Sequence, residues 1–268
     1  GLRIPDEYLK NKSFTIFRVA GGIGDWGIVS SMPRLLKQKY PNCKVYIPSS
    51  SLYSKLFKNA GSNHSTKKMY DIFNNNPYID GFQDDIKGEI FHDHYRIYSN
   101  NNPDIPLVEQ MLKFWQFEEN EYEDSQPEIY WTEEEKELGD KIIKEHVGDR
   151  EFGCLLISER FGTQFGKYDE KSFINDNKKI IKLLNNNKLP YFYWTYKPLN
   201  QFDFNFIDSV LDMHNIELRI QLYIKSKAKI NIGNQCGTNH CIVRYSDVYE
   251  VQRQPILGHN FVKGENYI

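Results

Sequence analysis

Apolar runs typical of β-strands alternate with helical patterns in both halves of the chain, and this alternation constrains the fold more than any other feature. The first half has FTIFRVA at 14–20, a helical pattern over about 26–40 and CKVYIP at 43–48. After residue 150 the alternation restarts, with strand-like runs at 152–158, 190–196, 228–233 and 247–251. Such alternation predicts an α/β fold built from parallel βαβ units.

Length and one helix boundary predict two lobes. The chain has 268 residues, which is more than one compact core usually needs. Thr132 and Glu135 form a capping box that opens a charged helix, and Gly148 is expected to end it. We therefore expect lobes at 1–148 and 149–268, mainly parallel sheets, and a ligand cleft between the lobes at the carboxyl ends of the strands. The last residues can return to the first lobe.

Charge and apolar content exclude several classes of protein. A net charge of −2 gives the chain no general attraction to nucleic acid or to an anionic membrane. No stretch reaches the roughly 20 apolar residues of a membrane-spanning helix, and the N-terminus lacks the apolar core of a signal peptide. We therefore expect a soluble, cytoplasmic protein with no integral membrane segment. The four cysteines lack paired spacing and are expected to be buried free thiols.

A glycine-rich turn, GGIGDWG at 21–27, joins the first strand to its helix. Dinucleotide and S-adenosylmethionine loops usually need an acidic residue at the end of the second strand, but this strand ends VYIPSSS, which argues against both kinds of loop. A P-loop is excluded because no Gly-Lys-Ser/Thr follows the turn. Asp25 would repel a phosphate but suits a neutral hydroxyl, so two roles stay open for it: helix cap or catalytic base. The candidate contacts for an acceptor in this turn are Gly22, Ile23, Gly24 and Trp26.

A second polar turn follows the strand-like run AKINIG and contains no acidic residue. Its backbone amides suit a diphosphate, with His240 as a further donor. The candidate donor-binding residues of this turn are Gln235, Cys236, Gly237, Thr238, Asn239 and His240.

Three residues outside that turn are further candidates for donor binding. Arg160 and Lys167 lie in a loop after a strand, where cations would neutralise a diphosphate leaving group; the alternative is ordinary surface charge. Thr195, at the end of the aromatic run PYFYWTY, is expected to border the donor base. The lysine-rich KSKAK at 225–229 lies at a helix end and is expected to be structural.

Together the three turns resemble those of the heptosyltransferase-like glycosyltransferases of family 9, whose GT-B architecture has two facing Rossmann-like lobes. The similar segments are GGIGDWGIVSSMPRLLKQKYPNCKVYI, RFGTQFGKYDEKSF and LRIQLYIKSKAKINIGNQCGTNHC. The resemblance implies that Asp25 is the general base, that Lys167 contacts the donor phosphates, and that Gly237 and His240 belong to the donor turn. The chain departs from the family at Gln235 and Cys236, where such enzymes often carry an acidic residue and a serine or threonine.

The resemblance implies an inverting transfer that needs no metal and no cofactor, from a nucleoside-diphosphate sugar to an acceptor hydroxyl. The acceptor would be a glycan, a lipid-linked glycan or a modified DNA base, so nucleic acid enters only as an acceptor. Two alternatives stay open: an S-adenosylmethionine-dependent methyltransferase and a catalytically silent nucleotide-binding or partner-binding module. His92 and His94 share one face of a strand, and we expect a polar strand end or an acceptor contact there rather than a metal site.

Overall fold

The chain divides into two compact units in the computed structural model, which describes residues 6–9, 12–18, 21–56, 67–86, 88–92, 105–158, 170–251 and 261–268. The first unit comprises Gly1–Tyr130 and His259–Lys263, and the second comprises Trp131–Gly258 and Gly264–Ile268. The boundary lies at 130/131 instead of the expected 148/149. Helix α8 (Glu133–Val147) belongs to the second unit because it packs against α10 (Leu218–Lys227).

The first unit is built around a four-stranded parallel sheet in the order β3-β2-β1-β4. Its strands are β1 (Ser13–Phe17), β2 (Lys44–Pro48), β3 (Gly81–Gln83) and β4 (Glu89–His92). Its helices are α1 (Asp6–Leu9), α2 (Ile23–Ile28), α3 (Met32–Lys39), α4 (Ser50–Leu56), α5 (Lys68–Phe73) and α7 (Leu107–Phe114). A short 3-10 helix, η1, spans Glu119–Glu121.

The single helix predicted over about 26–40 is two helices, α2 and α3. Pro33 lies in the first turn of α3, where its missing N–H has no helical partner to lose. Proline at this position is incompatible with one continuous helix from α2 into α3. The chain therefore forms a turn at residues 29–31 between the two helices.

The second unit contains a six-stranded parallel sheet in the order β10-β9-β8-β5-β6-β7. Its strands are β5 (Gly153–Ile157), β6 (Pro190–Thr195), β7 (Asp208–Asp212), β8 (Ile230–Asn234), β9 (Asp247–Val251) and β10 (Glu265–Tyr267). Its helices are α8, α9 (Glu170–Asn186), α10 and α11 (Gly237–Ile242), with a 3-10 helix, η2, at Leu199–Phe202.

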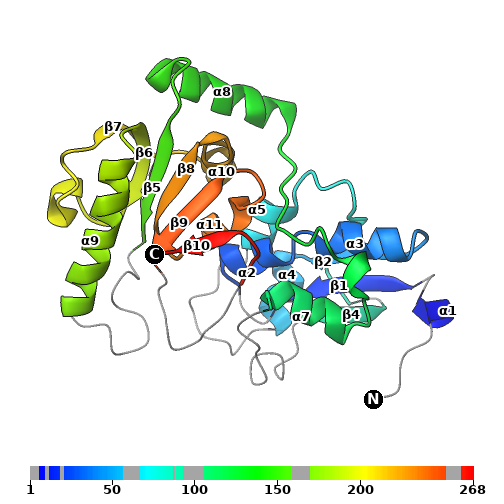
Figure 1. Ribbon diagram of the computed structural model, residues 1–268. Helices are drawn as coiled ribbons and strands as arrows, with labels where there is room; N and C mark the ends of the chain where they lie inside the picture. Colours follow the sequence, from blue (N-terminus) through cyan, green and yellow to red (C-terminus); the bar gives the residue numbers. More distant parts are fainter. Residues whose placement is uncertain are drawn as a thin grey trace. The chain divides into compact units, whose positions relative to one another are not determined.

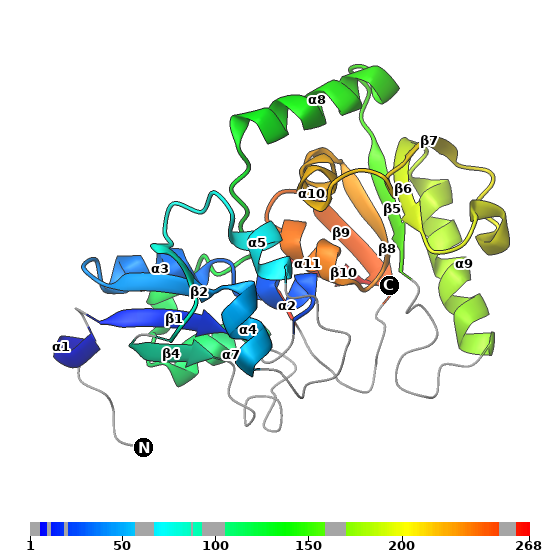
Figure 2. The same ribbon diagram turned by 180° about the vertical axis from the view of Figure 1, so that it is seen from behind.

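Helices cover both faces of this second sheet (Figure 1 and Figure 2). Alternate side chains of a strand point to opposite faces, so Leu155 of β5 packs in a core with Ile180 and Leu184 of α9. The preceding residue, Cys154, packs in a second core on the opposite face of the sheet, together with Ile220 and Ile224 of α10. The central strands are therefore buried on both sides, as expected of a parallel sheet.

Helix α8 begins and ends as the sequence predicts. Glu135 N–H donates to the Thr132 hydroxyl at 3.2 Å, and Thr132 N–H donates to the Glu135 carboxylate at 2.9 Å. Gly148 caps the carboxyl end with φ +64°, a conformation that favours glycine. None of the helices in the described part of the chain is long and apolar enough to cross a membrane.

All four cysteines are buried free thiols, as expected. Burial raises the pKa of Cys43 to about 11 and that of Cys154 to about 12. Only the thiolate is nucleophilic. Each unit by which the pKa of a thiol rises therefore lowers its reactivity about tenfold at any pH below that pKa. At pH 8 we expect Cys43 in the folded chain to react with iodoacetamide at least about 100-fold more slowly than after unfolding.

Peptide mass spectrometry after timed labelling measures this rate at each cysteine separately. Labelling of folded Cys43 should rise only as the pH approaches 11, whereas all four thiols of the guanidinium-unfolded chain should react at pH 8. Equal rates for Cys43 in the two states would contradict the prediction.

Candidate active site

Asp25 lies in the turn between β1 and α2, where it accepts two hydrogen bonds. The N–H of Gly22, the residue before the helix, donates to Asp25 Oδ2 at 2.9 Å. The Arg18 guanidinium, immediately after β1, donates to Asp25 Oδ1 at 3.1 Å. The side chain of Asp25 is 34% exposed. Asp25 thus lies at the third position of α2 and bonds back to Gly22, so Gly22 and not Asp25 is the N-cap residue, and the carboxylate remains accessible to a small molecule.

Arg18 was not among the residues singled out from the sequence. Its side chain is only 1% exposed, and it also contacts the sulfur of Met111 at 3.6 Å. A buried guanidinium needs a carboxylate partner, so the ion pair fixes the orientation of Asp25. The signal available in the sequence was an arginine interrupting the apolar run FTIFRVA, because such a charge requires a partner.

The other candidates in the first turn differ in accessibility. Gly22 is exposed and Ile23 is partly exposed, whereas Gly24 is buried. Trp26 is fully buried and packs edge-on against Tyr53 and Phe73, with ring centroids 5.8 and 6.2 Å away. Its side chain is therefore part of the core of the first unit, and only the backbone of this residue remains a candidate contact.

The second turn connects β8 to α11, and only part of it is open. Gly237 and Thr238 are partly exposed, whereas Gln235 and Cys236 are buried. The Gln235 amide donates to the Tyr267 hydroxyl at 3.1 Å, and the Cys236 sulfur lies 3.6 Å from the Thr238 hydroxyl. Gly237 and Thr238 are thus the predicted donor contacts that a ligand can reach most directly.

Asn239 and His240 face a buried polar network. Asn239 accepts a hydrogen bond from Lys225 Nζ at 2.6 Å and donates one to Glu250 Oε2 at 3.1 Å. His240 Nδ1 contacts the Glu265 carboxylate. The expectation that Lys225 is structural is met, but the lysine acts inside the unit, where it is fully buried, and not at an exposed helix end.

The remaining candidates lie elsewhere. Thr195 ends β6 and is only 5% exposed, next to the partly exposed Tyr196. Arg160, Lys167 and His94 lie outside the described residues. His92 is the last residue of β4, and its side chain also lies outside the described part.

Known structures resemble this chain along nearly its whole length. A glycosyl transferase of family 9 from Veillonella parvula covers 97% of this chain and 86% of its own, with 11% identity and a TM-score of 0.54. The iron-containing dodecameric glycosyltransferase TibC from enterotoxigenic Escherichia coli covers 92% of this chain and 59% of its own, with 9% identity and a TM-score of 0.50.

The chain has the GT-B-like fold of family 9 glycosyltransferases. Escherichia coli ADP-heptose LPS heptosyltransferase II is also similar, covering 96% of this chain and 90% of its own at 10% identity, with a TM-score of 0.47. No protein-family model and no curated protein matches the sequence. The GT-B-like fold expected from the resemblance of the three turns is thus confirmed by structure.

Proposed function

We propose that the chain is a glycosyltransferase that moves a hexosyl, heptosyl or pentosyl group from a nucleoside-diphosphate sugar to an acceptor hydroxyl. The observation that carries this proposal is the fold shared with the Veillonella parvula family 9 glycosyl transferase over 97% of the chain. The accessible, ion-paired Asp25 at the carboxyl end of β1 supports it. The first unit would bind the acceptor, and the second unit the donor.

In the proposed mechanism the Asp25 carboxylate takes the proton of the acceptor hydroxyl. The acceptor oxygen bonds to the anomeric carbon as the carbon–oxygen bond to the diphosphate breaks, and the electron pair leaves with the nucleoside diphosphate. Attack from the opposite face inverts the anomeric centre. Arg160, Lys167 and the backbone amides of the partly exposed Gly237 and Thr238 would stabilise the leaving charge without a metal ion. The acceptor would be a glycan, a lipid-linked glycan or a modified DNA base.

A second candidate is a silent nucleotide-binding or partner-binding module with the same fold. The inward orientation of Asn239 and His240 favours it, because two of the predicted donor contacts already have partners inside the unit. Such a module would bind a nucleotide or a partner and transfer no sugar.

Thermal unfolding of the full chain with ADP, UDP, GDP, CDP or S-adenosylmethionine tests both candidates. A ligand that binds only the folded state at 100 times its dissociation constant adds about 2.7 kcal/mol of stability, which is easily measured. We expect one nucleoside diphosphate to raise the unfolding temperature and Lys167→Ala to reduce the rise. Lys171→Ala, which removes an exposed lysine in α9, is the matched control and should leave it unchanged.

Turnover of the corresponding nucleotide sugar then separates the enzyme from the silent module. Stabilisation by S-adenosylmethionine alone would favour the methyltransferase alternative. Absence of any shift with the nucleoside diphosphates would contradict the donor-site proposal.

A further inference from the structure

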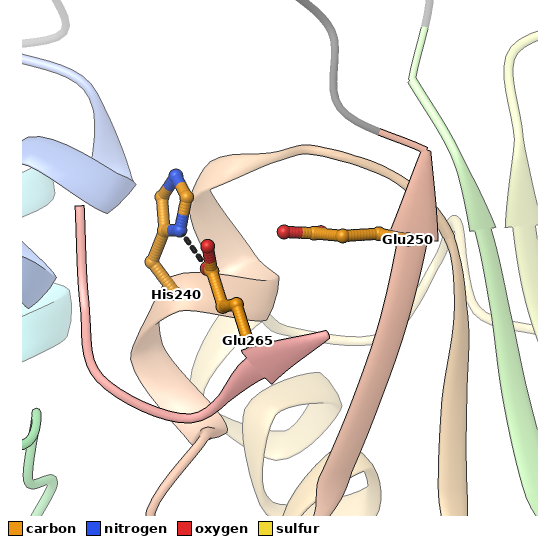
Figure 3. Close-up of side chains that lie close together, drawn as sticks. All are labelled: His240, Glu250 and Glu265. Carbon is orange, nitrogen blue, oxygen red and sulfur yellow. Dashed lines mark hydrogen bonds and ion pairs between the residues drawn. The ribbon is translucent and has the colours of Figure 1, made fainter. Parts of the chain in front are cut away.

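Three side chains from different elements meet inside the second unit. They are His240 of α11, Glu250 of β9 and Glu265 of β10, each offering one nitrogen or oxygen atom within 4.8 Å of the other two (Figure 3). The side chains of Glu250 and Glu265 are fully buried, and that of His240 is 8% exposed. Residues separated by as many as 25 positions thus converge on one buried point.

The hydrogen bonds around this point leave one buried oxygen unsatisfied. Glu265 Oε1 contacts His240 Nδ1, and Glu265 Oε2 accepts from the Tyr267 hydroxyl at 2.7 Å. Glu250 Oε2 accepts from the Asn239 amide at 3.1 Å. No hydrogen-bond partner within the described ranges reaches Glu250 Oε1, and Figure 3 shows this carboxylate directed toward the other two side chains. Buried polar atoms are nearly always paired, so an orphan oxygen indicates a missing partner.

The charges at this point are unbalanced. Two buried carboxylates lie side by side, and among the described residues the buried Lys225 is linked to Glu250 through Asn239. Two adjacent carboxylates in a buried site need positive charge between them, either a proton or a metal ion.

The donor set determines which ion suits the site. One imidazole nitrogen and two carboxylate oxygens are ligands for zinc and manganese, whereas calcium and magnesium prefer oxygen alone. Bonds of about 2.0–2.2 Å place neighbouring tetrahedral ligands about 3.4 Å apart, which is within the 4.8 Å span of the three atoms. The Asn239 amide and the Tyr267 hydroxyl would hold the two carboxylates in position, as the supporting residues of metal sites do.

We propose that His240, Glu250 and Glu265 bind one divalent transition-metal ion of the zinc or manganese class. Glu250 Oε1 becomes a ligand, and the contact between His240 and Glu265 opens to admit the ion. A fourth position is left for water. The ion ties the short edge strand β10 to β9 and to α11, so its first effect is on the stability of the second unit. The proposal does not depend on sugar transfer.

The test is calorimetric titration of the chelator-treated full chain with Zn²⁺ and Mn²⁺, and separately with Mg²⁺ and Ca²⁺. We expect one Zn²⁺ or Mn²⁺ ion per chain, binding at least about tenfold more tightly than Mg²⁺ or Ca²⁺, and a higher unfolding temperature with the ion bound. Glu250→Gln keeps the size of the side chain and an oxygen for the Asn239 amide. It should weaken binding of the ion at least about tenfold and abolish the thermal shift.

Asp212→Asn is the matched control, because Asp212 also pairs with a histidine, His214, in the second unit but at an exposed place. This variant should bind the ion as the wild type does. If Glu250→Gln does not fold, nitrogen-15 NMR spectra of the histidines in the wild type test the proposal instead. Zinc should shift the nitrogen resonances of one of the seven imidazoles. The proposal fails if the wild type binds no ion at one per chain, if a folded Glu250→Gln binds it equally well, or if no imidazole shifts.

Discussion

Asp25→Asn should lower the rate of sugar transfer by about 10²–10⁴-fold while nucleotide binding stays intact. An asparagine still offers an oxygen to the Gly22 N–H, so the cap of α2 survives, but the amide cannot take a proton from an acceptor hydroxyl. The variant therefore separates a catalytic role of Asp25 from its contact with Gly22 at the start of α2. Product formation from the nucleotide sugar identified by the unfolding experiments provides the measurement.

The control for this variant is an aspartate with a purely structural role in the same unit. Asp80 accepts from Val45 N–H at 2.8 Å and from Lys37 at 2.6 Å. Asp80→Asn should lower stability without a comparable loss of turnover. Asp25→Asn also removes the carboxylate that pairs with buried Arg18 at 3.1 Å and is expected to cost about 1–3 kcal/mol, so rates are compared where both variants are folded. Near-normal turnover in Asp25→Asn would restrict Asp25 to capping.

Trp26→Ala should destabilise the first unit by about 3–5 kcal/mol, the range found when a large buried aromatic side chain is removed. Trp26 has no exposed surface, and its contacts with Tyr53 and Phe73 join α2 to two further helices, α4 and α5. Since nothing else in this core has the volume to replace the indole, a cavity remains. Chemical unfolding followed by circular dichroism measures the loss.

Phe114→Ala in α7 is the comparison for Trp26→Ala, because that ring belongs to the same unit but is 50% exposed. It should cost less than about 1 kcal/mol. If the two units unfold in separate transitions, only the transition of the first unit should move. A loss below about 1 kcal/mol in Trp26→Ala would mean that the core of this unit refills the space.

Sequence patterns predicted the strands with strong apolar character and missed two at the edges of the second sheet. β5 and β8 are buried along their whole length and are visible as apolar runs. No residue of β7 is buried, and β10 has only three residues, Glu265–Tyr267. An edge strand buries less side-chain surface than a central strand, so it needs less apolar sequence, and its presence follows from pairing with a neighbour instead.

The candidate site shows the same limit. The sequence predicted that Asp25 would bond to a nearby backbone N–H, but that N–H belongs to Gly22, three residues back, and the ion pair with Arg18 depends on how the chain turns after β1. His240 was predicted to face a ligand from its place after a glycine turn. Its contact, Glu265, lies 25 residues further along, on a strand too short to predict. Local sequence patterns can therefore identify a polar residue in a turn, but they do not predict whether its side chain points toward a ligand or into the protein.

The division of the chain into units affects the order in which the protein can fold during synthesis. Domains usually fold as they leave the ribosome, the N-terminal one first. Here the first unit includes His259–Lys263, and the backbone carbonyl of Lys263 accepts from the Gln126 amide at 2.8 Å. That segment is translated after nearly all of the second unit. The first unit is thus completed only after residues 131–258 of the second unit have been translated, and it remains without this segment while most of the larger sheet is being made.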